Sequence, residues 1–177
     1  LNPTVFRLLN LLFHIGTAFL IFLIVAEIAK GFSTRLPFDS RSPMAWPAIV
    51  PAALFAVHTV NTEAVNYIWA RSSLLAAFFY LLAFYCFLQG PLKRQKEGNA
   101  LWHLAGLVSF AVGTATKATA ITLPAILILY EVLFLNPTRQ SALRLFCQEP
   151  SRLKKYIPVG AVFLAYILLR IILLPGT

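Results

Sequence analysis

Residues 5–29 read VFRLLNLLFHIGTAFLIFLIVAEIA, a run of apolar side chains interrupted only by isolated polar ones. Further apolar segments follow at roughly 44–60, 70–89, 101–116, 119–135 and 157–174. Of the 177 residues, 59% are apolar and 12% are charged, whereas an average soluble domain is about 45–50% apolar and about 25% charged. Such a chain has too few polar side chains to cover a water-soluble globule. The sequence therefore predicts an all-α, polytopic transmembrane helical bundle of about six spans, with residues 1–177 forming a single transmembrane domain.

Basic residues gather in three polar linkers between the apolar segments. These linkers, residues 30–42, 90–99 and 136–156, hold most of the 15 Lys and Arg side chains and explain much of the net charge of +9. Lys and Arg are enriched in the cytoplasmic loops of membrane proteins, so all three linkers are predicted to be cytoplasmic. The positive charge is therefore a membrane signature, and no nucleic-acid partner is expected.

Three cytoplasmic linkers require an even number of membrane crossings between each neighbouring pair. The segments 44–60 and 70–89 meet this requirement by turning over near residues 58–69. A single helix over 101–135 would be about 52 Å long, far beyond the roughly 30 Å hydrocarbon core. We therefore expect a helical hairpin that turns near residues 116–118, formed by two short helices or by a re-entrant pair.

This topology leaves several ionisable side chains on the opposite, non-cytoplasmic face. They are Arg7, His58, Glu63, Arg71, Lys117 and Arg170. Ionisable groups at or near the hydrocarbon are expensive and usually line a cavity or a substrate path. Any chemistry of the protein is therefore expected at that face.

The stretch 58–73, HTVNTEAVNYIWARSS, is the most informative part of that face. If it begins a helix that continues through the next apolar segment, Glu63, Tyr67 and Arg71 share one side at spacing i, i+4, i+8. With Asn66 and Ser73 alongside, this side could hold a phosphate and a reacting hydroxyl, because the planar arginine fork makes paired hydrogen bonds to phosphate. The alternative is an interfacial helix start, at which the N-terminal dipole favours an acidic residue.

Lys117 is the second candidate for binding an anion. It stands between two apolar segments and is flanked by Thr114, Thr116 and Thr119. Its ammonium could pair with an anionic headgroup. Alternatively, the side chain extends to the membrane interface and has no further role.

Other polar and small residues have structural explanations. Glu27 precedes Lys30 by three residues, which is typical of an ion pair at a helix end. Small residues that let helices approach closely form a stripe of Gly106, Ser109 and Gly113. His14, His103, Cys86 and Cys147 lack partners at metal-ligand spacing, so no metal is expected, and the cysteines are expected to be reduced and structural.

Three stretches resemble segments of a known enzyme family. Residues 58–85, HTVNTEAVNYIWARSSLLAAFFYLLAFY, and 115–134, ATKATAITLPAILILYEVLF, are similar to segments of the tetratricopeptide-repeat O-mannosyltransferases that act on cadherins, and of their bacterial relatives. Residues 6–25 resemble the second transmembrane helix of these enzymes, with Asn10 and His14 at family-like positions. The family belongs to the polyprenyl-phosphate-sugar-dependent C-type glycosyltransferases.

The resemblance implies a multi-pass, inverting glycosyltransferase of the bacterial inner membrane or the endoplasmic reticulum. Such an enzyme moves a hexose such as mannose from a polyprenyl-phosphate donor to an acceptor on the non-cytoplasmic face. The lipid-linked sugar is then a substrate, no cofactor is implied, and the expected partners are membrane lipids, the donor and other subunits of a membrane complex. By resemblance, Arg71 and Lys117 are expected to contact the donor phosphate, and the catalytic candidates Glu63 and His58 are expected on the acceptor side. The local pattern adds Asn66 and Tyr67 as further candidates for binding substrate.

The sequence departs from the family pattern at three places. Thr59 stands where the family has Pro after the histidine, and Ala118 stands where an acidic residue follows the lysine. The acidic catalytic residue of the superfamily lies on an external loop before the helix that opens this sequence, and no Asp or Glu precedes Glu27. We therefore expect the sequence to be a piece of a longer chain.

Two non-enzymatic interpretations stay open at this point. A general base must reach the acceptor hydroxyl directly or through one water, and Glu63 is the only carboxylate predicted on the correct face. A non-catalytic scaffold or accessory subunit of a membrane complex is therefore the alternative. A lipid or solute transporter is less well supported, because no paired broken helices indicate an internal repeat.

Overall fold

Every element in the described part of the chain is helical. The structure is a computed structural model that describes residues 3–33, 46–59, 71–90, 92, 100–135 and 156–173. The α-helices are α1 (Pro3–Ser33), α2 (Trp46–Val57), α4 (Arg71–Gln89), α5 (Ala100–Thr116), α6 (Leu123–Tyr130) and α9 (Ile157–Leu173), with a 3₁₀ turn η2 (Ala118–Thr122) before α6 and a π-helical turn η3 (Glu131–Leu135) after it. These bounds agree with the predicted segments to within a few residues, and the all-α prediction is confirmed for the described residues.

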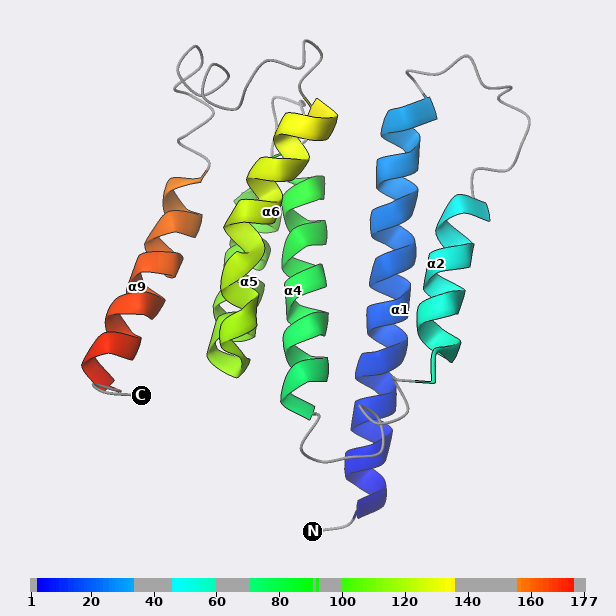
Figure 1. Cartoon of the computed structure of the whole chain (residues 1–177), viewed down its shortest axis with the longest axis horizontal. Coiled ribbons are helices and arrows are strands. Elements are labelled where there is room, and N and C mark those ends of the chain that lie inside the picture. The colour runs from blue at the N-terminus through cyan, green and yellow to red at the C-terminus, as the bar shows by residue number, and fades with distance from the viewer. Residues whose placement is uncertain are drawn as a thin grey trace.

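The helices lie side by side and alternate in direction along the chain (Figure 1). α4 packs against both α1 and α5, α2 packs against α1, and α9 packs against α5. As a result, the C-terminal ends of α1 and α4 lie at the same end of the bundle as the N-terminal ends of α2, α5 and α9. The described helix ends that border the three basic linkers lie there, and most residues of the linkers themselves lie outside the described ranges. Their cytoplasmic location stays a prediction.

The predicted hairpin between α5 and α6 is confirmed, and the chain turns at Lys117, within the predicted stretch 116–118. Lys117 has an extended backbone, with φ −154° and ψ 132°, so the helix cannot continue through it. Its amide donates a hydrogen bond to the carbonyl of Gly113 at 3.0 Å, and its own carbonyl accepts one from the amide of Ala120 at 3.1 Å. The reversal thus keeps the backbone polar groups paired, which a chain inside a membrane requires.

Two of the described helices are long and apolar enough to cross a membrane, over Thr4–Lys30 and Arg71–Gln89. The shorter apolar helices are Trp46–Val57, Ala100–Thr116, Ala118–Phe134 and Ile157–Ile172. Large apolar side chains point outward on most of them; on α1, for example, Leu12 is 65% exposed and Phe19 is 58% exposed. Outward apolar faces of this kind suit a lipid surround rather than water. The chain is a helical membrane protein, while the number of six spans stays a prediction.

The core lies where α4 meets α5 and α6. Its largest buried side chains include Phe87, Phe110, Leu123 and Leu127. The predicted small-residue stripe makes this approach close: a Cβ added to Gly106 would lie 3.1 Å from the Phe87 ring, and one on Gly113 would lie 3.5 Å from the Cβ atoms of Phe79 and Ala120. The stripe is therefore a packing feature of the α4–α5 contact.

Polar contacts lie at the linker-bearing end of the bundle, where the helix ends border the basic linkers. Lys30 and Glu27 form the predicted helix-end ion pair, with 3.0 Å between nitrogen and oxygen. Glu131 is completely buried and accepts a hydrogen bond from the Tyr156 hydroxyl, which ties the end of α6 to the start of α9. Cys86 is a buried free thiol, as predicted, and Cys147 lies outside the described residues.

Replacing Gly106 should destabilise the α4–α5 contact. In Gly106→Val, the new side chain must displace the Phe87 ring, and overpacking of this kind costs about 1–3 kcal/mol. The matched control is Gly160→Val on α9, where an added Cβ meets nothing within 4 Å. Thermal unfolding in detergent should show a lower midpoint for Gly106→Val alone, and equal midpoints for the two variants would contradict the packing described.

Candidate functional site

The site is built where the first turn of α4 meets the turn between α5 and η2. The Lys117 ammonium donates a hydrogen bond to the Ser73 hydroxyl at 2.8 Å, joining residues 44 positions apart. Arg71 begins α4 two residues before Ser73, and its guanidinium lies 5.3 Å from the centre of the Phe6 ring of α1. Two of the predicted phosphate-binding residues, Arg71 and Lys117, therefore lie at the same end of the bundle, with Arg71 directed to α1 and Lys117 to α4.

A small cavity of about 140 Å³ opens beside the Lys117–Ser73 contact. Its polar walls are formed by Ser73, Lys117, Tyr80 and Thr119, and its apolar walls by alanines of α4 and η2. The Tyr80 hydroxyl also accepts a hydrogen bond of 3.5 Å from Thr122. At about 30 Å³ per water, the space holds a few water molecules or a small polar group.

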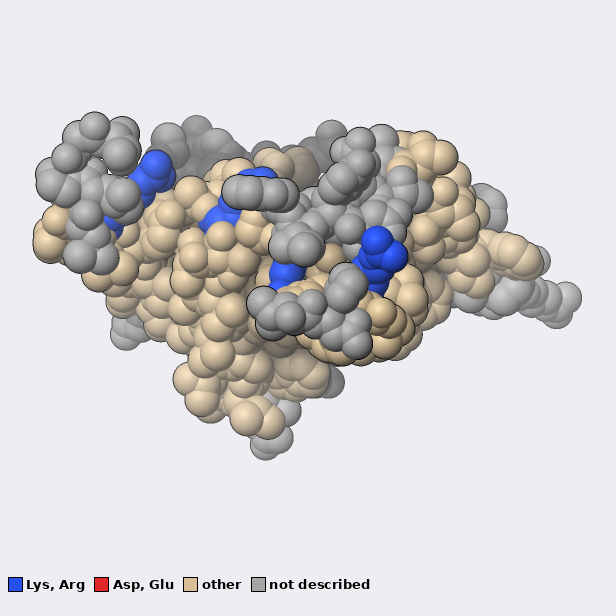
Figure 2. All heavy atoms as spheres, turned by 90° about the horizontal axis from the view of Figure 1, so that it is seen from below, with Lys and Arg blue, Asp and Glu red and all other residues tan. Residues whose placement is uncertain are grey.

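The described charged side chains at this end of the bundle all carry positive charge. Among the described residues, the cations there are Arg7, Arg71, Lys117 and Arg170, each near the end of its helix. Figure 2 shows this end from below, with separate blue Lys and Arg groups across it and no red Asp or Glu atom visible. The two described carboxylates, Glu27 and Glu131, belong to helix ends on the linker-bearing side. These described cations favour an anion at this end, and the N-terminal dipole of α4 acts in the same direction.

Of the other predicted site residues, only His58 lies in the described part of the chain. His58 directly follows the last residue of α2, has an exposed side chain, and donates a backbone hydrogen bond of 3.4 Å to the Phe55 carbonyl. Glu63, Asn66 and Tyr67 lie outside the described residues, so their roles stay predictions. Within the described ranges, no group of three or more His, Cys, Asp or Glu side chains could hold a metal ion.

His14 has a structural role that the sequence did not reveal. Its Nε2 atom lies 3.1 Å from the Ala56 carbonyl, and its ring stacks on Phe55 with centroids 5.2 Å apart. These contacts fix the C-terminal end of α2, two residues before His58, against α1. The only signal in the sequence was the pair Asn10 and His14, which lie one turn apart in an apolar helix and are both buried.

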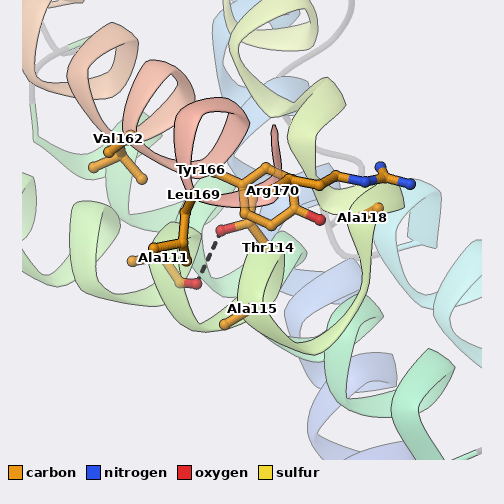
Figure 3. Close-up of a pocket in the computed structure, with 9 residues that line it drawn as sticks. Ala111, Thr114, Ala115, Ala118, Val162, Tyr166, Leu169 and Arg170 are labelled. Carbon is orange, nitrogen blue, oxygen red and sulfur yellow. Dashed lines mark hydrogen bonds between the residues drawn. The ribbon is translucent and has the colours of Figure 1, made fainter. Parts of the chain in front are cut away.

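A second, larger cavity of about 750 Å³ lies between α5 and α9 (Figure 3). Small and apolar side chains make up most of its wall, and Tyr166 and Arg170 supply polar groups from α9. Ala118 also lines it, directly after Lys117 in the chain. The two cavities thus lie on either side of the same chain reversal.

These features define a helical membrane protein whose described charged side chains at one end of the bundle are all cations. Protein O-mannosyl-transferase TMTC3 of Homo sapiens is 34% identical to the chain over 136 residues, and its Mus musculus counterpart is 37% identical over the same length; each alignment covers 75% of this chain. Protein O-mannosyl-transferase Tmtc2 of Drosophila melanogaster is 29% identical over 180 residues, which covers 98% of this chain and 16% of that protein. The chain belongs to the TMTC protein O-mannosyl-transferase family, as the sequence resemblance predicted.

The similarity covers only a part of each relative. The chain spans 13% of the length of the two TMTC3 proteins. No family model matches the chain, and no solved structure matches it. The predicted C-type glycosyltransferase fold therefore stays a prediction.

Loss of the His14 contact should loosen the α1–α2 pair. His14→Leu removes the ring nitrogen next to the Ala56 carbonyl and should lower the free energy of unfolding by about 1–2 kcal/mol. Ile15→Leu, at an outward-facing position on the same helix, is the control and should unfold like the wild type. If both variants unfold alike in denaturant titrations, the His14 contact does not hold α2 in place.

Proposed function

We propose that the chain is the donor-binding membrane part of a glycosyltransferase that moves mannose from a polyprenyl-phosphate donor to a protein hydroxyl. The observation that carries this proposal is the Lys117–Ser73 contact at the bundle end that also carries Arg71, where the described charges are all positive. The transfer of mannose to protein follows the names of the relatives. The lipid-phosphate donor follows from the chemistry of the cations together with the family resemblance.

Lys117 and Arg71 would stabilise the leaving phosphate. When the bond between the anomeric carbon and the phosphate oxygen breaks, negative charge grows on that oxygen. Preorganised cations aimed at a developing charge are among the strongest sources of catalysis. The Lys117 ammonium acts as a point charge held by Ser73, whereas the Arg71 fork can bind two phosphate oxygens at once.

The acceptor would approach from the segment that joins α2 to α4. The acceptor oxygen attacks the anomeric carbon, polyprenyl phosphate leaves, and the hydroxyl proton passes to a general base within hydrogen-bonding reach or one water away. Our candidates for this base are Glu63 and His58, with Asn66 and Tyr67 as further substrate-binding residues. The described geometry supports this proposal through His58, which follows the α2 end that His14 fixes.

The proposal also includes a topology. The linkers 30–42, 90–99 and 136–156 face the cytoplasm, so the site faces an endoplasmic-reticulum lumen or a periplasm. Residues 1–177 form one transmembrane domain, a part of a longer chain, with about six spans and a C-type glycosyltransferase fold. Its partners are membrane lipids, the lipid-linked donor and other subunits of a membrane complex.

Removing either cation should weaken donor binding. In the native full-length chain, Arg71→Ala and Lys117→Ala should each reduce the affinity for polyprenyl-phosphate mannose about 10- to 100-fold, because a charge-assisted contact to phosphate is lost. Lys117→Arg should recover part of the loss. Binding is measured by titration in lipid nanodiscs, and mannose transfer to an acceptor peptide is followed in parallel.

The control for this experiment is Lys30→Ala. This lysine pairs with Glu27 at the linker-bearing end, so its loss should leave donor affinity unchanged. Wild-type affinity in both Arg71→Ala and Lys117→Ala would refute the proposed site. Donor binding without any transfer by the native chain would favour the scaffold or accessory-subunit alternative.

A further inference from the structure

The cavity between α5 and α9 has the size and lining of a site for a hydrocarbon chain. Its volume of about 750 Å³ falls within the roughly 300–1,000 Å³ range of small-molecule sites. Alanines from α5, η2 and α9 keep it open, and Val162 and Leu169 complete the apolar wall. Because the lining runs along α9 from Val162 to Arg170, the groove is about 12 Å long on that side.

One end of this groove is polar. Arg170, in the last turn of α9, extends toward the part of the chain that carries Ala118, and the Tyr166 hydroxyl lies one turn before it (Figure 3). Thr114 also lines the groove, but its hydroxyl donates to the carbonyls of Phe110 and Ala111 at 3.0 and 2.9 Å. The groove therefore has one cationic end, and that end lies at the reversal that carries Lys117.

We infer that this groove binds the isoprenoid chain of the lipid donor, with Arg170 as a third cation for the donor phosphate. The inference rests on the proposed function, which places the phosphate near Lys117. The groove is lined by residues that flank Lys117 in the sequence, namely Thr114, Ala115 and Ala118. An isoprenoid chain can therefore pass from a phosphate at this reversal into the apolar space. A single chain with one phosphate suits a groove that has a single cationic end.

The test compares two lengths of ligand in the native full-length chain. The probes are a long-chain polyprenyl phosphate and a short-chain analogue with the same phosphate, both titrated in nanodiscs. Ala165→Phe fills the groove and should weaken the long-chain probe about tenfold, because buried apolar contact is lost, while the short-chain probe binds as before. Arg170→Gln should weaken both probes about tenfold, because both carry the phosphate.

The matched control is Ala161→Phe, an exposed position one turn earlier on α9 that does not line the groove. It should bind both probes like the wild type. If Ala165→Phe retains wild-type affinity for the long-chain probe while Arg71→Ala and Lys117→Ala lose theirs, the groove inference fails and the proposed function stands. If Arg71→Ala and Lys117→Ala bind like the wild type, the proposed function fails.

A photoreactive polyprenyl phosphate shows whether the groove holds the donor chain, a bilayer lipid or another segment of protein. Crosslinks should map to α5 and α9 and should disappear with excess unlabelled polyprenyl phosphate. This result supports the inference even if Lys117 and Arg71 do not bind the phosphate. Equal competition by an anionic bilayer phospholipid would show that bulk lipid fills the groove. Crosslinks from α9 to another segment of the native chain, in place of the probe, would show that protein covers it. Either of these results overturns the inference.

Discussion

The chain reverses direction at Lys117 because the apolar run from α5 to η3 is longer than a membrane is thick. A single helix that crosses a hydrocarbon core of about 30 Å has about 20 residues. The run from Ala100 to Leu135 is far longer than that. The extended backbone of Lys117 ends α5, and its paired amide and carbonyl make the reversal tolerable away from water. The thickness of the membrane thus requires a reversal within this run, and Lys117 lies at its tip.

The position of that lysine then depends on how closely the hairpin packs against α4. Gly113 brings α5 into contact with Phe79 of α4 and with Ala120 of η2, and Gly106 does the same with Phe87 one layer further along the bundle. Larger side chains at the glycines would push α5 away from α4. The Lys117 ammonium would then leave the Ser73 hydroxyl, so core packing and the candidate site are parts of one contact.

Much of this arrangement could be predicted from local sequence, and the rest could not. The lengths of the apolar runs predicted the helices and a turn near Lys117. The spacing of Glu27 and Lys30 predicted their ion pair, and the small side chains of α5 predicted its close packing. The contacts of Lys117 with Ser73 and of His14 with Ala56 depend instead on how each helix is rotated about its axis. Helices such as α1 and α5 are apolar around nearly their whole circumference, so no polar face indicates that rotation.

Net charge alone cannot explain why this end of the bundle would bind an anion, because the linkers at the other end hold more Lys and Arg. The described cations at this end differ in how their side chains are held. Lys117 is held by Ser73 at the mouth of a small cavity, and Arg71 lies against the Phe6 ring. A side chain that is already held in place loses less conformational freedom when it binds an anion. At this end, the positioning of a few cations therefore matters more for anion binding than their number.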